Sequence, residues 1–263
     1  MKFAIVNNIK TEAEKGVKGY CPICSAELTA RCGIQKVHHW AHKIIRNCDP
    51  WWENETEWHR TWKGKFSTTW QEVICMDSLT GEKHIADIKT EHGLVIEFQH
   101  SHIDPIERNS RERFYKNMLW VINGTRLKRD YPRFLKGKAT FRSTKQIGIF
   151  LVDNIEDCFP SSWISCSVPV VFDFKGSEEI QHANDLRNYL YYLFPKTNTS
   201  ESMVAIISRE SFINWIINDN LFKQQKETLQ QTANPQLKKT NNLPQRQSPY
   251  VYVRGRYVKR KRF

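Results

Sequence analysis

The sequence has no run of about 18 apolar residues, so it lacks a segment able to cross a membrane as a helix. The opening stretch, MKFAIVNNIK, is too short and too polar for a secretory signal peptide. The seven cysteines are odd in number and irregularly spread, which disfavours a disulfide framework. These absences favour a reducing, cytoplasmic location, where cysteines serve as thiols or metal ligands.

Acidic residues are scarce relative to basic ones. The 263 residues include 40 Lys and Arg against 28 Asp and Glu, a formal net charge of +12. Such an excess in a chain with 12% aromatic residues first indicates a polyanionic partner, usually nucleic acid, although a merely basic surface is the alternative. Apolar residues make up 40% of the chain, so its body is not intrinsically disordered.

A cysteine pair and a histidine pair suggest a metal site near the N-terminus. Cys21-Pro-Ile-Cys24 precedes His39-Trp-Ala-His42, and two thiolates with two imidazoles form a tetrahedral zinc set. The spacing does not choose between His38 and His39, and Cys32 or Cys48 is an alternative to a histidine. Unmetallated thiols and a redox pair are the other interpretations.

The middle of the chain alternates helix and strand signals. Asp49 and Pro50 mark a helix start, and aromatic residues every four positions extend that helix over about 50–69. The next elements expected are three strands, a helix and a strand: 72–76, 84–90, 94–99, 104–117 and 119–122. This order predicts an α/β fold.

Ionisable residues recur on one face of the first helix. Glu55, His59 and Lys63 are spaced i, i+4 and i+8, which aligns the three side chains. A solvated salt-bridge ladder is the simplest interpretation of that spacing alone.

The expected strands add two carboxylates. Asp87 lies in the second strand, and Glu97 and Gln99 share a face of the third, in the spacing D-x9-E-x-Q. A hairpin between the strands brings Asp87 opposite that face, and two such carboxylates suit Mg²⁺. The pattern is that of an Asp…Glu-x-Lys nuclease site with Gln in the last place, although a hairpin with an exposed polar face also fits.

The motifs occur in an order that resembles the CoiA-like competence proteins. They are Cys21–Cys24, Gly33–His42, Glu55–Lys63, Ile85–Ile88 and Val95–Ser101. The resemblance covers roughly residues 17–123. It implies a restriction-endonuclease-like core of the PD-(D/E)xK class, a mixed sheet flanked by helices, preceded by a small zinc-binding element.

The resemblance also implies roles for individual residues. Glu55, Asp87 and Glu97 fall on the carboxylates that hold Mg²⁺ or Mn²⁺, and His59 and Lys63 fall on the helix-borne His and Lys. Gln99 stands where a catalytic Lys is commonest, and it brings no positive charge. Lys63 is the candidate for the missing charge, and Lys89 is the alternative.

Two functions are therefore expected from the sequence. The first is a metal-dependent deoxyribonuclease acting on single- or double-stranded DNA. The second is a non-catalytic nucleic-acid-binding factor on a degenerate nuclease fold. Neither involves a membrane, and the C-terminal half is a candidate surface for a protein partner.

The remaining chain completes the expected organisation. Strands are expected at 147–152 and 168–174, and helices at 179–194 and 212–222. The domain boundaries expected are an N-terminal strand and zinc element, a nuclease core, a helical extension, and a flexible linker with a basic tail: 1–48, 49–175, 176–223 and 224–263. The nucleic-acid-binding residues expected in the tail are Arg254, Arg256, Lys259, Arg260, Lys261 and Arg262.

Overall fold

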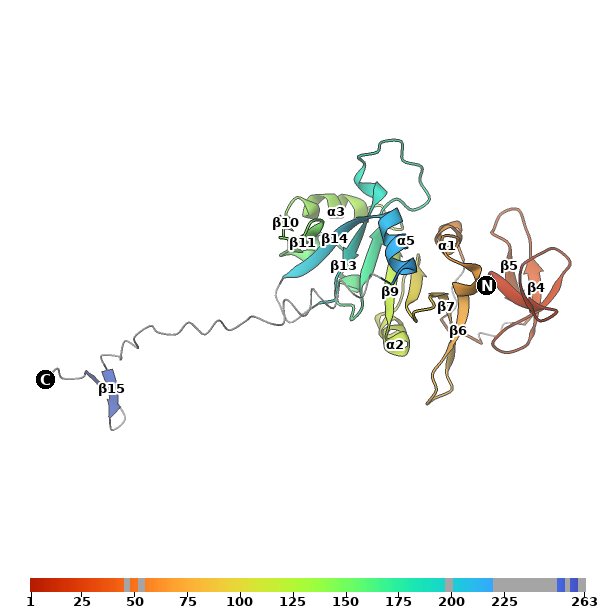
Figure 1. Ribbon diagram of the computed structural model, residues 1–263, viewed down its shortest axis with the longest axis horizontal. Coiled ribbons are helices and arrows are strands. Elements are labelled where there is room, and N and C mark those ends of the chain that lie inside the picture. The colour runs from red at the N-terminus through yellow and green to blue at the C-terminus, as the bar shows by residue number, and fades with distance from the viewer. Residues whose placement is uncertain (45–47, 52–54, 197–200, 220–249, 254–255, 260–263) are drawn as a thin grey trace. The chain divides into compact units, whose positions relative to one another are not determined.

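The computed structural model describes residues 1–44, 48–51, 55–196, 201–219, 250–253 and 256–259. It divides into two units, Met1–Asn220 and Leu221–Phe263 (Figure 1). The second unit contains a hairpin of β15 (Tyr250–Val253) and β16 (Arg256–Lys259). The expected linker over 224–248, and Arg254, Arg260, Lys261 and Arg262 of the expected tail, lie outside the described residues.

The first unit begins with a five-stranded antiparallel sheet in the order β2-β1-β3-β4-β5. Its strands are β1 (Phe3–Val6), β2 (Ile9–Glu12), β3 (Lys18–Tyr20), β4 (Glu27–Arg31) and β5 (His39–His42). A Cβ atom on Gly19 would lie 2.8 Å from Ala4 Cβ and 2.9 Å from the Trp40 ring, so only glycine fits between them. Trp40 fills the small core of this sheet.

A nine-stranded mixed sheet forms the larger part, in the order β10-β11-β14-β13-β12-β9-β8-β7-β6. Its strands are β6 (Gln71–Met76), β7 (Lys83–Lys89), β8 (Val95–Gln99), β9 (Met118–Asn123), β10 (Arg142–Ser143), β11 (Ile149–Val152), β12 (Val170–Asp173), β13 (Tyr189–Leu193) and β14 (Ser202–Ser208). The central strands β8, β9 and β12 run parallel. Every residue of β8 and β9 is buried, as expected for parallel strands covered on both faces.

Helices cover both faces of this sheet. They are α1 (Glu57–Lys63), α2 (Pro105–Tyr115), α3 (Asp130–Lys138), α4 (Ser161–Ile164) and α5 (Arg209–Ile217). Trp62 of α1 packs on Phe98 and on Phe212 of α5, while Glu112 of α2 accepts a hydrogen bond from Trp120. Trp120 is paired with Glu97 and shares its face of the sheet, whereas the neighbouring residue Phe98 points to the other face. The contacts of α1 and α2 therefore lie on opposite faces.

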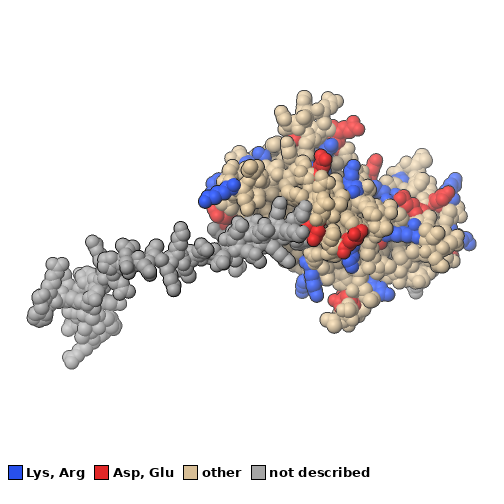
Figure 2. Space-filling view, in the orientation of Figure 1, with Lys and Arg blue, Asp and Glu red and all other residues tan. Residues whose placement is uncertain are grey.

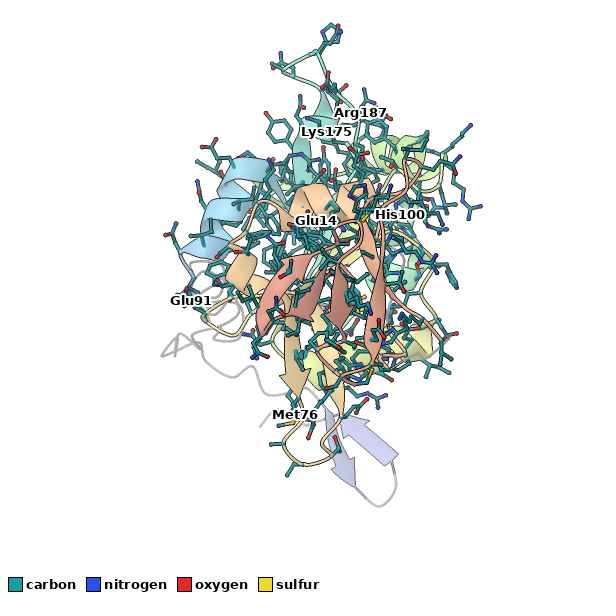
Figure 3. All side chains as sticks on the ribbon, turned by 90° about the vertical axis from the view of Figure 1, so that its right-hand side faces the viewer. Glu14, Met76, Glu91, His100, Lys175 and Arg187 are labelled. Atoms are coloured by element: carbon teal, nitrogen blue, oxygen red, sulfur yellow. The ribbon has the colours of Figure 1, made fainter. Side chains whose placement is uncertain are left out.

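Charges of both signs are mixed on one face of the first unit (Figure 2). On the face shown in Figure 2, basic side chains are interspersed with acidic ones over the first unit. Figure 3 turns the five-stranded sheet toward the viewer and labels Met76 where the β6–β7 hairpin extends beyond it.

Several predicted elements are confirmed. The α/β class is correct, the helix expected at 104–117 is α2 with Asp104 as its N-cap, and the strand expected at 119–122 lies within β9. The strands expected around Asp87 and Glu97 form the antiparallel pair β7–β8.

The helix expected over 50–69 is present but shorter, as α1, whereas the helix expected over 179–194 is wrong. The first helix begins after an N-cap at Thr56, not at Asp49, because the Asp49 carboxylate instead accepts hydrogen bonds from the backbone N–H groups of Trp51 and Ile85. Residues 189–193, expected within a helix, form β13, which pairs with β12 and β14. The nine-stranded sheet therefore continues beyond residue 175 with two further strands, where a helical extension was expected.

Candidate active site and metal centre

Four sulfur and nitrogen ligands converge beside the N-terminal sheet. The side-chain ligand atoms of Cys21, Cys24, His42 and Cys48 all lie within 4.8 Å of one another. Cys21 Sγ is 3.5 Å from Cys48 Sγ, and His42 Nε2 is 3.4 Å from Cys24 Sγ and 3.6 Å from Cys48 Sγ. A tetrahedral zinc ion with ordinary Zn–S and Zn–N bonds spaces its ligands by roughly 3.3–3.8 Å, so this group can hold a metal such as zinc.

The fourth ligand differs from the predicted one. His39 and His42 stand three residues apart on the extended strand β5, so they point to opposite faces. His39 Nδ1 lies 2.9 Å from the carbonyl oxygen of Val37, and Cys48 takes the expected place of His39 in the cluster. The prediction of His39 is wrong, while Cys21, Cys24 and His42 lie where a zinc site requires them.

The donor chemistry of this cluster also suits a cation. Burial, followed by contact with the Cys21 and Cys24 thiols, raises the pKa of the Cys48 thiol to about 12. Three crowded thiols ionise together only when a positive ion offsets their mutual repulsion.

A second constellation forms where β7 and β8 separate. Their paired register runs through Lys89↔Val95 and Ile88↔Ile96. Beyond it, the N–H of Asp87 donates to Glu97 Oε1 (3.2 Å) and the N–H of Phe98 donates to Asp87 Oδ2 (3.0 Å). Where the hairpin opens, the two carboxylates therefore accept the backbone N–H hydrogen bonds that strand carbonyl groups would otherwise accept.

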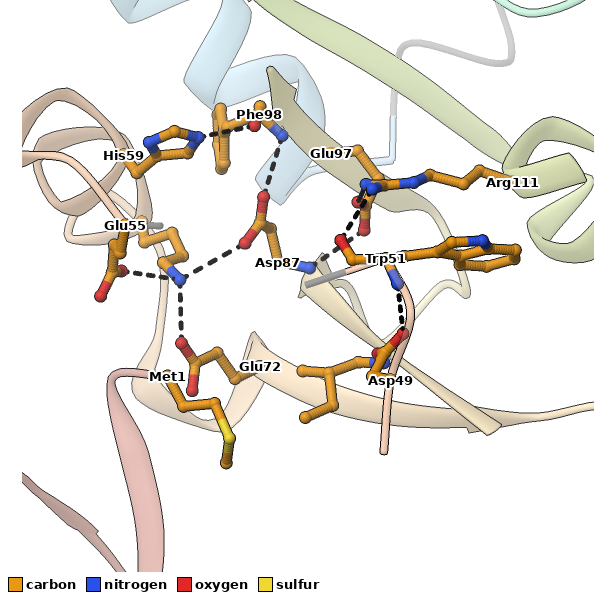
Figure 4. A pocket seen from close by; sticks show the side chains of 12 residues that line it. Met1, Asp49, Trp51, Glu55, His59, Glu72, Asp87, Glu97, Phe98 and Arg111 are labelled. Carbon is orange, nitrogen blue, oxygen red and sulfur yellow. Dashed lines mark hydrogen bonds and ion pairs between the residues drawn. The ribbon is translucent and has the colours of Figure 1, made fainter. Parts of the chain in front are cut away.

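Lys63 links these strands to α1. Its Nζ lies 2.7 Å from Glu55 Oε1, 3.0 Å from Glu72 Oε1 and 3.4 Å from Asp87 Oδ1 (Figure 4). Burial opposes ionisation of Lys63, but Glu72, Asp87 and Glu55 outweigh it and raise the pKa of Lys63 above its usual value. Lys63 is thus held as a buried cation among three carboxylates.

Glu97 lies on the opposite side of Asp87 from Lys63. Its Oε2 accepts from Arg111 Nη1 at 3.1 Å, and Arg111 also donates to the backbone oxygen of Trp51. Burial, and then the charge of Asp87, raise the pKa of Glu97 to about 8, although Arg111 opposes this shift. Glu97 and Asp87 therefore repel each other when both are ionised, and a bound cation would offset that repulsion.

The carboxylates line a small cavity of about 60 Å³. That volume exceeds the roughly 10–15 Å³ that one water requires, so it has room for an ion with part of its hydration shell. The Asp87 side chain is 25% exposed, against 6% for Glu55 and for Glu97, so solvent reaches the cavity at Asp87. Carboxylate oxygens are the ligands that Mg²⁺ and Mn²⁺ prefer, so the set fits such an ion.

Sequence comparison identifies the N-terminal region. Residues 6–50, which contain all four ligands of the sulfur-rich cluster, match the family described as Competence protein CoiA, N-terminal domain. The N-terminal region of the chain is CoiA-like. Competence protein CoiA of Bacillus subtilis (strain 168) is 28% identical to it over 128 residues, which cover 44% of this chain. The match spans about a third of that relative's length (34%), and no solved structure matches.

His59 links the start of α1 to β8. Its Nδ1 accepts from the N–H of Thr56 at 3.2 Å, which places the ring proton on Nε2, 2.8 Å from the carbonyl oxygen of Phe98. The imidazole joins the start of α1 to β8 beside the carboxylates. These contacts suit a positioning role better than proton transfer.

Gln99, which stands at the usual lysine position, and Lys89, the alternative to Lys63, both lie away from the carboxylate cavity. Gln99 does not line the 60 Å³ cavity; it lines a neighbouring pocket, where its amide lies 3.3 Å from Ser101 Oγ. Lys89 lies near the Cys75 thiol, where it opposes the rise that burial causes in the pKa of that thiol. Among the described residues, Lys63 is thus the lysine that lines the carboxylate cavity.

Two residues of this site were absent from the sequence prediction. Glu72 lies in β6 with a φ of +44°, and its carboxylate accepts from the backbone N–H groups of Lys2 and Phe3. Burial acts against its ionisation, but Lys63, the N-terminal amine and those N–H groups lower the pKa of Glu72 to about 2. Arg108 and Arg111 stand three apart on one face of α2, and this spacing was the sequence feature that could have indicated Arg111 as a site residue.

The aromatic stripe of α1 belongs to the core of the first unit. Trp58 and Trp62 are 3% and 4% exposed, and both indole N–H groups donate to Asp173 Oδ2 at 3.0 Å. They are therefore not available to stack on nucleic-acid bases. No helix in the part of the chain that the structure describes is long and apolar enough to cross a membrane.

Proposed function

We propose that this chain is a metal-dependent nuclease that cleaves DNA phosphodiester bonds, on a restriction-endonuclease-like core. The observation that carries the proposal is the pairing of Asp87 and Glu97 at the opening of the β7–β8 hairpin, with Lys63 beside them. The succession α1, β6, β7, β8, α2, β9 also has the order that the PD-(D/E)xK resemblance implies.

In this proposal Asp87, Glu97 and Glu55 hold Mg²⁺ or Mn²⁺. When bound, the ion supplies charge that polarises a phosphodiester and activates water. Lys63 stabilises negative charge that develops on the phosphate, because its three carboxylate neighbours keep it protonated. His59 fixes α1 to β8 and so holds Lys63 in register with Asp87.

The likeness to Competence protein CoiA supports a role in DNA uptake, and defence against foreign DNA is the other setting for this chemistry. Zinc in the Cys21, Cys24, His42 and Cys48 cluster is part of the proposal and serves the fold. The basic residues of the tail, including Arg256 and Lys259 on β16, are proposed to contact phosphates.

A cleavage assay tests the proposal. Linear and circular, single- and double-stranded DNA are incubated with Mg²⁺ or Mn²⁺ and with the wild type, Asp87→Asn or Glu97→Gln. We expect cleavage by the wild type and a loss of at least about 100-fold in each variant, since metal-held charge is worth several kcal/mol in the transition state. Asp153→Asn, an exposed carboxylate in the turn after β11, is the control and should cleave normally. Full activity in the Asp87→Asn, Glu97→Gln double variant would refute the proposal.

One observation favours the second candidate, a non-catalytic nucleic-acid-binding factor. Lys63, Arg60 and Arg111 already pair with Glu55, Glu72, Asp87 and Glu97, so the protein's own cations offset much of the carboxylate charge. Calorimetric titration with Mn²⁺ separates the two functions. Binding that depends on Asp87, without cleavage of any DNA or RNA form, would support this candidate.

A further inference from the structure

A second pocket lies at the carboxyl ends of the parallel strands β8 and β9. Gln99, which lines it, stands two residues and about 6.7 Å along β8 from Glu97 of the carboxylate site. The pocket has a volume of about 220 Å³. In open α/β sheets, the carboxyl ends of parallel strands are the usual place for a ligand.

Three segments of the chain bound this pocket. They are the loop after β8 with His100 (labelled in Figure 3), the β9–α3 connection with the first turn of α3, and the start of α4 at 160–163. Asn123 is 5% exposed; it donates to His100 Nδ1 at 3.0 Å and accepts from the N–H of Thr125. The walls are therefore fixed by hydrogen bonds within the fold.

The pocket is basic. Arg126, Arg129 and Arg133 line it, and Asp130 is the only acid among the described residues that do so. Arg129 is the N-cap residue of α3, Arg126 lies three residues before it and Arg133 lies in the first turn, so the three arginines are near one another at this end of the helix. Arg133 lies 4.0 Å from Asp130, whereas Arg126 and Arg129 form no ion pair with the part of the chain that the structure describes. Three guanidinium groups against one carboxylate leave an excess of two positive charges.

Polar residues flank this charge. Ser161 and Ser162 line the pocket, and the nine-residue helix α3 begins beside it with no side chain capping its N-terminus. In its first turn the N–H groups of Asp130 and Arg133 already donate to backbone oxygens and Pro132 has no N–H, so the helix adds mainly positive potential. The lining thus combines charge and donors as anion sites do.

We propose that this pocket binds the terminal phosphate monoester of a nucleic-acid strand. A monoester carries a charge of about −1.5 to −2 at pH 7, which matches the excess of two positive charges. An internal diester carries a single negative charge and would leave one of these positive charges unmatched, so the charge balance favours the end of a strand. The inference rests on the proposed nuclease function and makes the enzyme act near phosphorylated ends.

Binding to Asp87→Asn of the full chain tests this assignment without cleavage. Fluorescence anisotropy compares one single-stranded oligonucleotide with a 5′-phosphate, a 3′-phosphate or hydroxyls at both ends. We expect one phosphorylated form to bind at least about tenfold more tightly than the hydroxyl form, as two charge-assisted guanidinium contacts allow. Inorganic phosphate should reduce binding of that form and leave binding of the hydroxyl form unchanged.

Variants then localise the effect. Adding Arg126→Gln and Arg129→Gln, both exposed, should abolish the preference, whereas Lys136→Gln with Lys138→Gln at the other end of α3 should retain it. Equal affinity for all three ends, or equal loss in both variants, would overturn the inference. Discrimination between ends in a protein that cleaves nothing would instead reject the nuclease and keep the phosphate pocket. Cleavage by the wild type, with equal binding of phosphorylated and hydroxyl ends, would reject the phosphate pocket and keep the nuclease.

Discussion

Asp173 joins the large sheet to the helix that carries His59 and Lys63. It is fully buried at the end of β12; its Oδ2 accepts from Trp58 and Trp62, and its Oδ1 accepts from the N–H of Lys175 at 2.8 Å. Arg209 of α5 donates to both oxygens. One carboxylate therefore fastens α1 and α5 to the same strand end.

Asp173→Asn removes the charge while keeping the size of the side chain. Breaking a buried ion pair costs about 3–5 kcal/mol, and the Arg209 side chain is 24% exposed, so we expect a loss of about 3 kcal/mol. Asp153 offers a matched control, because it pairs with Arg142 through two hydrogen bonds (3.2 and 2.8 Å) but is 56% exposed. Asp153→Asn should cost less than about 1 kcal/mol.

Urea unfolding followed by tryptophan fluorescence measures both losses. Burial opposes ionisation of Asp173, but Arg209, Trp58 and the N–H of Gly176 hold its pKa below the usual 3.8. The carboxylate therefore stabilises the fold above that pH, and its contribution fades as the pH falls below 3.8. The difference between wild type and Asp173→Asn should follow the same course. A loss below about 1 kcal/mol at pH 7, or one equal to that of Asp153→Asn, would refute the reasoning.

Three further predictions concern the two sites. Cys48→Ser should abolish binding of one zinc ion per chain, measured by colorimetric titration, whereas Cys32→Ser, outside the cluster, should retain it. Mn²⁺ affinity should rise between pH 6 and 8 by up to tenfold per pH unit, because burial and Asp87 raise the pKa of Glu97 to about 8 and the ion displaces that proton. Lys63→Met should lower the free energy of unfolding by about 3–5 kcal/mol at pH 7, because Glu55, Glu72 and Asp87 lose the buried cation that offsets their charge.

Each of these predictions has an outcome that contradicts it. Equal zinc content in Cys48→Ser and Cys32→Ser would remove Cys48 from the metal centre. Mn²⁺ affinity that stays constant from pH 6 to 8 would show that Glu97 is not a ligand that binds a proton. A Lys63→Met protein as stable as the wild type, with no gain in stability on adding Mn²⁺, would show that the carboxylates do not depend on that cation.

Sequence patterns predicted the parts of the fold that local chemistry decides. Asp104 followed by Pro105 is a cap and a first helical residue, and both serve α2 in those roles. Two strand-like runs on either side of a turn predicted the hairpin that brings Asp87 and Glu97 together, because strand alternation and the intervening turn are local properties. The apolar run after α2 predicted the buried strand β9 for the same reason.

The errors arose where distant partners decide the structure. Asp49 resembles a helix cap, yet its carboxylate binds Ile85 and His84, 36 and 35 residues away. Residues 189–193 carry leucines at helical spacing, yet β12 and β14 on either side impose the extended form. Neither competing contact is visible in a local window.

The position of Glu72 has a practical consequence for experiments with chelators. Trp40, two residues before the cluster ligand His42 on β5, donates its backbone N–H to the carbonyl oxygen of Met1 (2.9 Å). The backbone N–H groups of Lys2 and Phe3 donate to Glu72, which pairs with Lys63, so a short chain segment connects the two sites. EDTA would strip a metal from the sulfur cluster and from the carboxylates alike, so inactivation by EDTA does not by itself identify a catalytic ion. Adding back Mg²⁺ and Zn²⁺ separately would assign the loss to one centre or the other.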